Sequence, residues 1–344
     1  MATAKVPSTM RAWQYTTTKG GLVPNLKLND VAVPHPKPEQ HLVQILTSAL
    51  NPVDYKPAEI ALFSYFAIPK PATPGVDFAG RIVTPAAGSS LKAGQLVFGV
   101  AGITPWAAGA LREYSVTELN GTAALPEGLD QKDAATIGVA GLTAYQSIIP
   151  HVKPGDHVFI NGGSGGTGVF AIQIAKAAGC HVTTSCSTPN VELCKSLGAD
   201  EVVDYKKQTV LDALRAKGQT IDHVVDNVGS FDLYFQCHKF TKPNAQWIGV
   251  GASPSLSIVW QMAKVNLLPG FLGGGKRKYA GFFAESRTDH LAQVAAWMKE
   301  GKVKAVVDQQ FEFEAVPQAF EKLKTHRARG KIVIDVASEK GGNA

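Results

Sequence analysis

The sequence predicts an α/β protein that combines a compact β-rich domain with a doubly wound parallel-sheet domain. Three observations carry this prediction. Residues 10 to about 135 hold short β-like runs cut by Pro and Gly, whereas from residue 157 onward short apolar runs alternate with helix-like segments. A glycine-rich turn, residues 162–168, joins the first of those later runs to the first helix-like segment. Repeated strand–turn–helix units build parallel sheets with helices on both faces.

In the first region, candidate strands lie at residues 41–46, 80–83 and 95–100, with a Pro-rich turn at 33–38. Short strands with this punctuation indicate a barrel-like β domain. Residues 134–146 are small and apolar, which suits a closely packed helix or a linker.

The second region repeats a strand–helix unit with short turns. Helix-like segments end at Ala178 and Gly198, and Thr188 is placed to cap the second of them, with Pro189 at its first position. A third helix is expected over residues 210–216. The expected strands are 157–160, 181–185, 201–204, 223–226, 246–250 and 279–283.

The C-terminal part adds further elements after about residue 285. They are a helix at 289–299, a polar strand around Phe311, a helix at 316–324 and a last strand at 331–335. These strands exceed the six of a doubly wound sheet, so we expect the C-terminus to return to the first domain. The predicted division is residues 1–140 with 285–344 for one domain and residues 141–284 for the other.

The composition is that of a globular chain large enough for two domains. Of its 344 residues, 45% are hydrophobic and 18% are charged. No apolar run reaches 18 residues, and the N-terminus lacks the apolar core of a signal peptide, so we expect no membrane span. Four cysteines without metal-ligand spacing make neither a metal site nor a disulfide framework. We therefore expect a reducing, cytoplasmic compartment.

The chain carries a net charge of +6. This charge forms either a solvated basic surface or an attraction for an anionic ligand such as a phosphorylated cofactor. Nucleic-acid binding is a third reading, but the densest basic run, residues 322–331, looks like the end of a helix, where cations suit the dipole. No RNA-binding motif occurs, so we do not expect a nucleic-acid partner.

The glycine turn is the strongest single motif. Gly163, Gly165 and Gly168 satisfy G-x-G-x-x-G between a predicted strand and a predicted helix. Such a turn lets the backbone approach a pyrophosphate, and the helix N-terminus adds free N–H groups and the positive end of the dipole. An ordinary glycine-rich loop is the alternative.

The segment after the second strand favours NADPH over NADH. NAD-binding folds of this type carry an acidic residue there for the ribose hydroxyls, but no Asp or Glu lies between Val169 and Val191. The strand ends in hydroxyl and amide residues, including Ser187 and Asn190, which can donate to a 2′-phosphate that a carboxylate would repel. Lys195 and Tyr205 are nearby candidates. Helix capping is an alternative role for Ser187 and Asn190, and both roles can coexist.

Five stretches carry a family resemblance. They are LNPVDYK at 50–56, PGVDFAG at 74–80, the glycine turn, LGAD at 197–200 leading to VDY at 203–205, and GKIVID at 330–335. In order and spacing they resemble the zinc-independent, quinone-oxidoreductase-like branch of the medium-chain dehydrogenase/reductase family. The resemblance runs nearly end to end. It implies a GroES-like β-barrel catalytic domain split between the two chain ends, with a Rossmann NADPH-binding domain inserted.

The same resemblance implies that no metal takes part. Zinc-dependent members hold their catalytic metal with Cys, His and Cys, and the matching positions here are Asn51, Val76 and Val139, none of which supplies a thiolate or imidazole. The clustered cysteines of a structural zinc lobe are also missing. What remains is direct hydride transfer to an acceptor that needs no Lewis acid, such as a quinone or an activated C=C.

The resemblance further implies a set of cofactor contacts beyond the glycines of the turn. Ser164, Gly165, Gly166 and Thr167 would meet the pyrophosphate. The remaining contacts are Ser187, Asn190 and Tyr205 at the 2′-phosphate and adenosine, Val228 after the fourth strand, and Lys331.

Four residues of the loop after the first long strand are catalytic candidates. The resemblance places Asn51 and Asp54 beside the nicotinamide ribose, where Asn51 would hold the substrate carbonyl or the ribose. Turn formation is an equally good account of both. Tyr55 or Lys56 would supply a proton or a hydrogen bond to the forming enolate, with Tyr145 or solvent as alternatives.

Apolar residues suggest where an acceptor binds. Residues 62–66 are the most aromatic stretch of the first domain, and with Trp260, Met262 and Phe271 they form either the wall of a lipophilic pocket or a core or dimer interface. The span 252–278 is long for a loop and contains three consecutive glycines, so it is a candidate flap over the site.

The leading prediction is an NADPH-dependent reductase of quinones or α,β-unsaturated carbonyls, which are small molecules. The family resemblance also implies a homodimer. A close variant is a trans-acting enoyl reductase on a carrier-bound polyketide or acyl chain, for which Lys276, Arg277 and Lys278 would offer an acidic carrier a basic patch. The alternative from another class is an RNA-binding or structural protein on a reductase fold.

Overall fold

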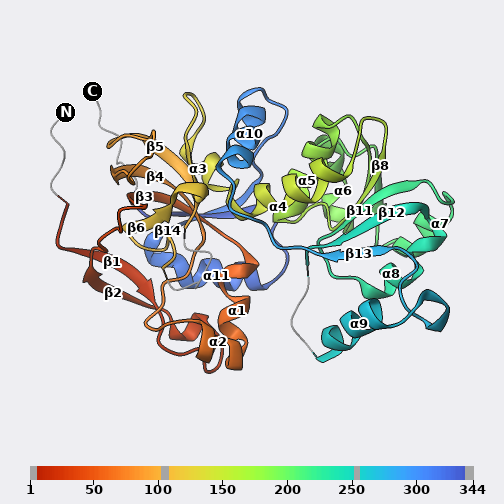
Figure 1. Ribbon diagram of the computed structural model, residues 1–344, viewed down its shortest axis with the longest axis horizontal. Coiled ribbons are helices and arrows are strands. Elements are labelled where there is room, and N and C mark those ends of the chain that lie inside the picture. Colours follow the sequence, from red (N-terminus) through yellow and green to blue (C-terminus); the bar gives the residue numbers. More distant parts are fainter. Residues whose placement is uncertain (1–5, 102–107, 252–255, 338–344) are drawn as a thin grey trace. The chain divides into compact units, whose positions relative to one another are not determined.

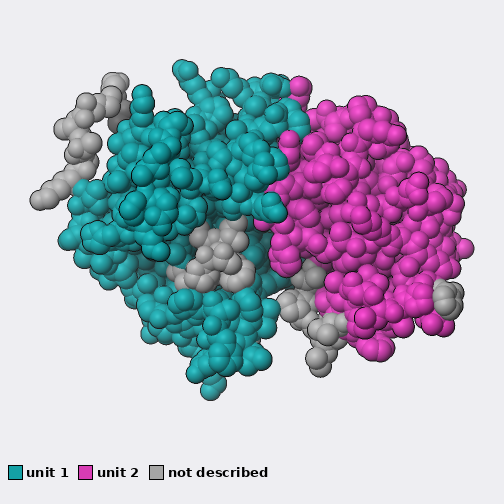
Figure 2. Space-filling model, in the orientation of Figure 1, with its two compact units in different colours: residues 1–142, 285–301, 305–344 teal, residues 143–284, 302–304 magenta. Residues whose placement is uncertain are grey.

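The computed structural model describes residues 6–101, 108–251 and 256–337, and the order of its elements can be followed in Figure 1. The chain forms two compact units, which Figure 2 colours separately. Unit 1 comprises residues 1–142, 285–301 and 305–344, and unit 2 comprises residues 143–284 and 302–304.

Unit 1 is built on a seven-stranded sheet and a separate two-stranded pair. The order of the large sheet is β14-β15-β3-β4-β5-β7, with β6 pairing on β3. Its strands are β3 (Gln40–Leu50), β4 (Asp77–Thr84), β5 (Leu96–Val100), β6 (Tyr114–Glu118), β7 (Thr122–Ala124), β14 (Val307–Glu312) and β15 (Lys331–Asp335), and the separate pair is β1 (Thr9–Gln14) with β2 (Lys27–Ala32). The C-terminal strand β15 runs antiparallel to β3, so the end of the chain returns to the N-terminal sheet, as the number of strands predicted.

Short helices complete unit 1. They are α1 (Lys56–Glu59), α2 (Ala61–Ala67), α3 (Gln131–Ala135), α10 (Thr288–Lys299) and α11 (Val316–Lys324), and α4 (Gly138–Ile148) begins in this unit. Helix α11 matches the predicted range. Its Val316, Ala319 and Phe320 are buried, which is the i, i+3, i+4 spacing of a helix with one core-facing stripe.

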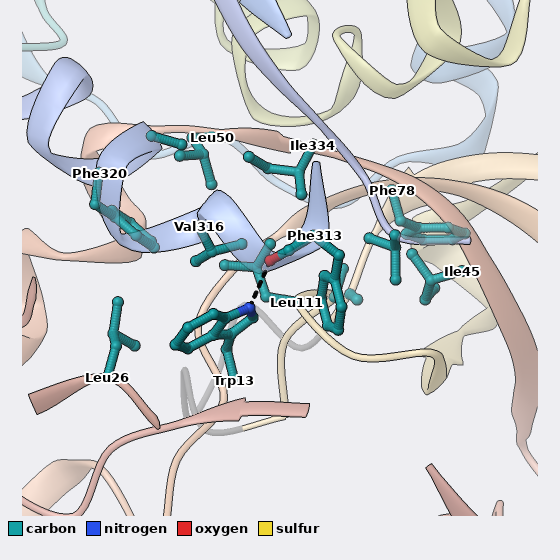
Figure 3. Packing of buried hydrophobic residues seen from close by; sticks show 14 of the residues in the cluster. Trp13, Leu26, Ile45, Leu50, Phe78, Leu111, Phe313, Val316, Phe320 and Ile334 are labelled. Atoms are coloured by element: carbon teal, nitrogen blue, oxygen red, sulfur yellow. Dashed lines mark hydrogen bonds between the residues drawn. The ribbon is translucent and has the colours of Figure 1, made fainter. Parts of the chain in front are cut away.

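The core of unit 1 joins segments that are far apart in the sequence (Figure 3). The Trp13 indole Nε1 donates a hydrogen bond to the Phe313 carbonyl at 2.7 Å. Leu50 of β3 and Ile334 of β15 belong to the same cluster as these residues. Burial of each such large side chain contributes about 2–3 kcal/mol, so the C-terminal elements hold the N-terminal ones in place.

Unit 2 is a six-stranded parallel sheet in the order β10-β9-β8-β11-β12-β13. Its strands are β8 (His157–Asn161), β9 (His181–Cys186), β10 (Glu201–Asp204), β11 (Ile221–Asp226), β12 (Thr241–Gly249) and β13 (Lys278–Gly281), and its helices are α5 (Gly166–Ala177), α6 (Val191–Ser196), α7 (Val210–Arg215), α8 (Phe231–Gln236) and α9 (Leu256–Leu267). The order reverses between β8 and β11. Ligands of doubly wound sheets bind at the carboxyl ends of the strands next to such a reversal.

Two local predictions in unit 2 are wrong. Thr188 does not cap the helix, because residues 188–190 form a 3₁₀ turn with Ser187 at its N-cap, and α6 begins only at Val191. The span 252–278 is not a loop, because it contains α9, a 12-residue helix. Residues 252–255 and the Phe271 side chain lie outside the described part of the chain.

The aromatic stretch of unit 1 is neither wholly core nor wholly surface. On α2, Leu62, Tyr65 and Phe66 are 73–78% exposed, whereas Phe63 packs against the core. In the part of the chain that the structure describes, no helix combines the length and apolar character that crossing a membrane requires.

Candidate functional site

The glycine turn of unit 2 is shaped by close packing. A Cβ on Gly168 would lie 2.2 Å from the Gly162 carbonyl oxygen, and one on Gly163 would lie 2.1 Å from Thr184 Oγ1. Gly162 has a φ of +82°, a conformation that side chains rarely adopt. Gly165 differs, since the nearest atom to its Cβ would be 3.7 Å away. Three glycines are therefore needed by the fold, and Gly165 leaves open space in front of the helix.

That open space faces the start of α5. Gly165 is the N-cap of this 12-residue helix, no side chain caps it, and its first turn contains no acidic residue. Gly166 and Thr167 therefore present uncapped N–H groups at the positive end of the helix dipole. This arrangement, at the carboxyl end of β8, is the one that binds the pyrophosphate of a dinucleotide.

Polar residues at the ends of β8 and β9 fix the turn. The Ser185 hydroxyl accepts from the Gly162 N–H at 3.0 Å and donates to Asn161 Oδ1 at 2.6 Å. Asn161 Nδ2 donates to the Asp226 carboxylate at 2.9 Å. Sequence reasoning did not single out these three residues. The sequence signal that could have found them is a polar residue at or near the carboxyl end of each of the buried strands β8, β9 and β11.

Asp226 holds the loop that carries Val228. Its carboxylate accepts backbone N–H groups of Val228 at 3.0 Å, Gly229 at 3.1 Å and Ser230 at 2.6 Å. Burial raises the pKa of Asp226, although these hydrogen bonds oppose the rise. Val228 itself is 58% exposed. A cavity of about 450 Å³ opens beside this loop, lined by Asn161, Gly229 and Ser230 together with residues of α7, α8 and α9.

The structure brings together three predicted contacts for the 2′-phosphate and pyrophosphate. Asn190 Nδ2 lies 3.1 Å from Ser164 Oγ and 3.2 Å from Ser187 Oγ. The other amide atom, Oδ1, is buried and has no hydrogen-bond partner among the described residues. Turning the amide over would let both hydroxyls donate to Oδ1, since amide orientation is assigned from the network rather than observed.

The remaining predicted nucleotide contacts of unit 2 are exposed. Tyr205 follows β10, is 49% exposed, and has the Lys206 ammonium 5.7 Å from its ring centroid. Lys195 pairs instead with Glu192 at 2.9 Å, so the structure gives it a local partner on α6.

In unit 1, the loop after β3 contains a reciprocal turn. The Asn51 N–H donates to Asp54 Oδ2 at 2.7 Å, and the Asp54 N–H donates to the Asn51 carbonyl at 3.0 Å. Both side chains are buried. Burial raises the pKa of Asp54 to about 8, and the neighbouring Asp77 carboxylate adds to the rise. Asp54 is therefore mostly protonated at neutral pH.

Lys331 joins this loop from the opposite end of the chain. Its ammonium donates to the Leu50 carbonyl at 3.0 Å, to Asn51 Oδ1, and to Asp77 Oδ2 at 3.0 Å. An ammonium has three N–H donors, so all of them are used within unit 1, and the residue is 2% exposed. The predicted contact of Lys331 with the cofactor therefore lacks a free donor. Sequence reasoning named Lys331 and Asn51 but missed Asp77.

Tyr55 and Lys56 differ as proton donors. Tyr55 is 5% exposed and packs in the core, with the Lys324 ammonium 5.4 Å from its ring centroid, and burial raises its pKa. Its burial and its raised pKa make Tyr55 a poor acid. Lys56 is half-buried, and burial lowers its pKa, which brings its ammonium closer to releasing a proton at neutral pH.

The residues present do not fit a metal. Within residues 6–101, 108–251 and 256–337, no group of three His, Cys, Asp or Glu side chains is placed to hold an ion. At the three positions that match the ligands of zinc-dependent family members, the Asn51 amide oxygen accepts a hydrogen bond from an ammonium, and the side chains of Val76 and Val139 are hydrocarbon. The four cysteines are free and buried in unit 2.

Known proteins resemble the chain over almost its whole length. Two family profiles match, an alcohol dehydrogenase GroES-like domain at residues 37–127 and a zinc-binding dehydrogenase at residues 197–334. The trans-enoyl reductase pgmF of Aspergillus terreus is 46% identical, covering 96% of this chain and 97% of the relative. The chain belongs to the medium-chain dehydrogenase/reductase family, in its zinc-independent quinone and enoyl reductase branch.

Two further members of the family are similar to the chain over most of their length. An NADPH-dependent alkenal/one oxidoreductase of Arabidopsis thaliana is 31% identical, covering 97% of this chain and 81% of the relative. The quinone oxidoreductase from Coxiella burnetii superposes with a TM-score of 0.81 at 28% identity, covering 96% of this chain and 100% of that one. The predicted GroES-like and Rossmann fold is confirmed, and the chain is an oxidoreductase with a nicotinamide dinucleotide site.

Replacing Gly168 and Gly165 by alanine, one at a time, should separate the glycine that folding requires from the glycine that cofactor binding requires. Gly168→Ala brings a Cβ against backbone and should lower the melting temperature by about 5 °C or more. Gly165→Ala meets no protein atom closer than 3.7 Å and should leave the melting temperature unchanged, yet weaken binding of the nicotinamide dinucleotide at least about tenfold by filling the space expected for the pyrophosphate. Thermal melts and a fluorescence titration with NADPH measure both. Unchanged binding in a folded Gly165→Ala protein would contradict the placement.

The raised pKa of Asp54 predicts a pH dependence of stability. The folded pKa of about 8 exceeds the unfolded value of about 3.9, so stability is fully present below pH 4 and is lost as the pH rises toward 8. Between about pH 5 and pH 8, wild type should lose on the order of 1–3 kcal/mol more than Asp54→Asn, which keeps an acceptor oxygen. The free energy of unfolding, measured with denaturant at about pH 5 and about pH 8, tests this expectation. The exposed Asp232→Asn control should follow wild type; parallel losses in all three proteins would rule the assignment out.

Proposed function

We propose that the chain is an NADPH-dependent reductase that transfers a hydride to a quinone or to the activated C=C of an α,β-unsaturated carbonyl, without a metal. The observation that carries this proposal is the cluster of Ser187 and Asn190, after β9, with Ser164 of the glycine turn after β8, and no carboxylate occurs between Val169 and Val191. Hydroxyl and amide donors suit a 2′-phosphate, and a carboxylate would repel it. We infer an acceptor that is reduced without a metal, because Asn51, Val76 and Val139 offer no thiolate or imidazole ligand.

The roles divide between the two units. In unit 2, the N–H groups of residues 164–167 bind the pyrophosphate, Ser187 and Asn190 bind the 2′-phosphate, and Tyr205 and Val228 flank the adenosine. When bound, the nicotinamide supplies the hydride. In unit 1, Asn51 orients the acceptor or the nicotinamide ribose, and Lys56 is the preferred proton donor because burial already lowers its pKa.

A second candidate is enoyl reduction on a carrier-bound acyl or polyketide chain. It is favoured by the 46% identity to a protein named a trans-enoyl reductase. The predicted docking patch for an acidic carrier does not support it. Lys278 begins β13, and Arg277 donates to the carbonyl of Thr241, the first residue of β12, at 2.9 Å. This basic run therefore lies at the amino ends of the strands, opposite the edge that holds the glycine turn.

Two predictions about the assembled protein belong with this proposal. Strand β13 ends the sheet order of unit 2, so its outer edge is available for pairing with a second copy, and we expect a homodimer. The cytoplasmic location stays an expectation from composition.

An oxidation assay tests the proposed function. Absorbance of NADPH at its reduced-nicotinamide band should fall when quinones, enones or enoyl thioesters are added, and NADH should serve more poorly. The class that is turned over distinguishes the two candidates. If no quinone, enone or enoyl thioester is reduced, the reductase proposal is wrong. RNA binding with steep salt dependence would then favour an RNA-binding protein on a reductase fold.

A carboxylate at position 187 should reverse the cofactor preference. Ser187→Asp places a negative charge where the 2′-phosphate is expected, and the ratio of kcat/KM for NADPH to that for NADH should fall about 100-fold or more. Ser196→Asp, a change of the same kind on the exposed face of α6, is the matched control and should leave the ratio near the wild-type value. Equal ratios in both variants would refute the assignment of Ser187.

A further inference from the structure

Two of the four cysteines contact each other beside the residues proposed for the 2′-phosphate. Cys186 is the last residue of β9 and directly precedes Ser187. Cys194 lies on α6, and its thiol donates a hydrogen bond to the Cys186 sulfur. Both side chains are at most 1% exposed. A pair of buried thiols therefore joins a strand that ends at the nucleotide edge to the helix that follows it.

The backbone around Cys186 is tied to two parts of the nucleotide edge. The Cys186 carbonyl accepts the Tyr205 N–H at 3.1 Å. The carbonyl of the preceding residue, Ser185, accepts the Gly163 N–H at 2.9 Å. A displacement of Cys186 would therefore reach residues expected at both the adenosine and the pyrophosphate.

The chain between the two thiols carries the donors proposed for the 2′-phosphate. Ser187 is the N-cap of the 3₁₀ turn Thr188–Asn190, and the Asn190 N–H donates to the Ser187 carbonyl at 2.8 Å. Helix α6 begins at the next residue, Val191. A covalent bond between residues 186 and 194 would enclose Ser187 and Asn190 in one ring.

The hydrogen bond makes the two thiols chemically unequal. It lowers the pKa of the Cys186 thiol, although burial and the Asp204 carboxylate oppose that change. The same hydrogen bond, together with burial, raises the pKa of the Cys194 thiol. The thiolate is the form that attacks an oxidant. Cys186 is therefore the attacking residue, and Cys194 is placed to resolve its oxidised form.

The other two cysteines have a different environment. The Cys180 thiol donates to the Lys153 carbonyl at 3.8 Å, and the Cys237 thiol is hydrogen-bonded to Thr241. Burial raises the pKa of Cys180 to about 11 and that of Cys237 to about 12. Among the residues that the structure describes, neither is hydrogen-bonded to a second thiol. They are matched controls for a buried cysteine without a thiol neighbour.

We propose that Cys186 and Cys194 form a reversible disulfide when the protein meets a peroxide, and that this disulfide weakens cofactor binding. The Cys186 thiolate breaks the O–O bond of hydrogen peroxide and becomes a sulfenic acid, and the hydroxide that leaves is protonated to water. The Cys194 sulfur then displaces the sulfenic hydroxyl, which leaves with the Cys194 proton as a second water. The two thiols lose two electrons, the peroxide accepts them, and a dithiol reverses the change.

The effect on the cofactor follows from the geometry of a disulfide, and this part rests on the proposed function. A disulfide draws its two sulfurs to about 2.05 Å, which is closer than two hydrogen-bonded thiols. Helix α6 has only six residues, and its Glu192 and Lys195 side chains are 83% and 56% exposed. It is therefore the element that moves, and the turn with Ser187 and Asn190 moves with it.

Formation of the disulfide is tested on the full chain. Reduced protein is treated with hydrogen peroxide, its free thiols are blocked with N-ethylmaleimide, and it is digested with trypsin and a protease that cleaves after Glu192. This digestion separates Cys186 from Cys194 unless a disulfide joins them. Mass spectrometry should find the joined peptides in wild type and in C180S, and not in C194S. Free thiols at both positions, or a disulfide of Cys180 or Cys237 instead, would overturn the proposal.

The effect on binding is measured by fluorescence titration with NADPH. Peroxide should raise the Kd of wild type about tenfold or more, and dithiothreitol should restore it. C194S, checked for folding by circular dichroism, should keep its Kd within about twofold after the same treatment. Saturating NADPH should raise the midpoint potential of the thiol pair by about 30 mV for each tenfold difference in Kd. An unchanged Kd in fully linked wild type contradicts the effect on binding.

The outcomes separate this proposal from the proposed function. If wild type reduces none of the acceptors, the reductase function is wrong, while the mass and affinity measurements still decide the role of the disulfide. If wild type binds NADH and not NADPH, the cofactor preference is wrong, and the same titrations with NADH decide whether the disulfide weakens binding.

Discussion

The antiparallel pairing of β15 with β3 is the constraint on which the unit 1 site depends. It sets Ile332 opposite Leu50, and this register brings Lys331 to the residue that follows Leu50 although the two are 280 positions apart in the sequence. Every residue of β15 is buried. Closing so long a loop costs little more than closing a short one, since the entropy grows only with the logarithm of length. The apolar strand face therefore suffices to carry a lysine into the interior.

Asp226 has a comparable role in unit 2. One carboxylate accepts three backbone N–H groups and an amide, so it orders the loop after β11 and ties it to the end of β8. Both strands flank the point where the sheet order reverses. The exposed Val228 is thus held through its backbone by a buried carboxylate.

The sequence predicted most of unit 2 because its signals are local. Strand 201–204 of unit 2 matches the observed β10, as helix 316–324 of unit 1 matches α11, and the glycine turn lies where a strand meets a helix. Local signals also caused the errors. Three glycines near residue 274 suggested a flap and obscured α9, and Thr188 looked like a cap although Ser187 holds that position. Asp77 was missed because its partners come from β15 and α4, and no spacing in the sequence announces contacts of that range.

Charge balance links the buried carboxylates of unit 1. Asp54, Asp77 and Lys331 interact with one another in a place without solvent, and a single ammonium neutralises a single carboxylate. Asp77 contacts the ammonium directly. Burial raises the pKa of both carboxyl groups, that of Asp54 to about 8, and the Lys331 ammonium opposes the rise in each case. Positions 51, 76 and 139 hold an amide and two valines, so none of the three side chains offers a thiolate or an imidazole to a metal. The charge beside these positions comes instead from Lys331 and the carboxyl groups that it contacts or approaches.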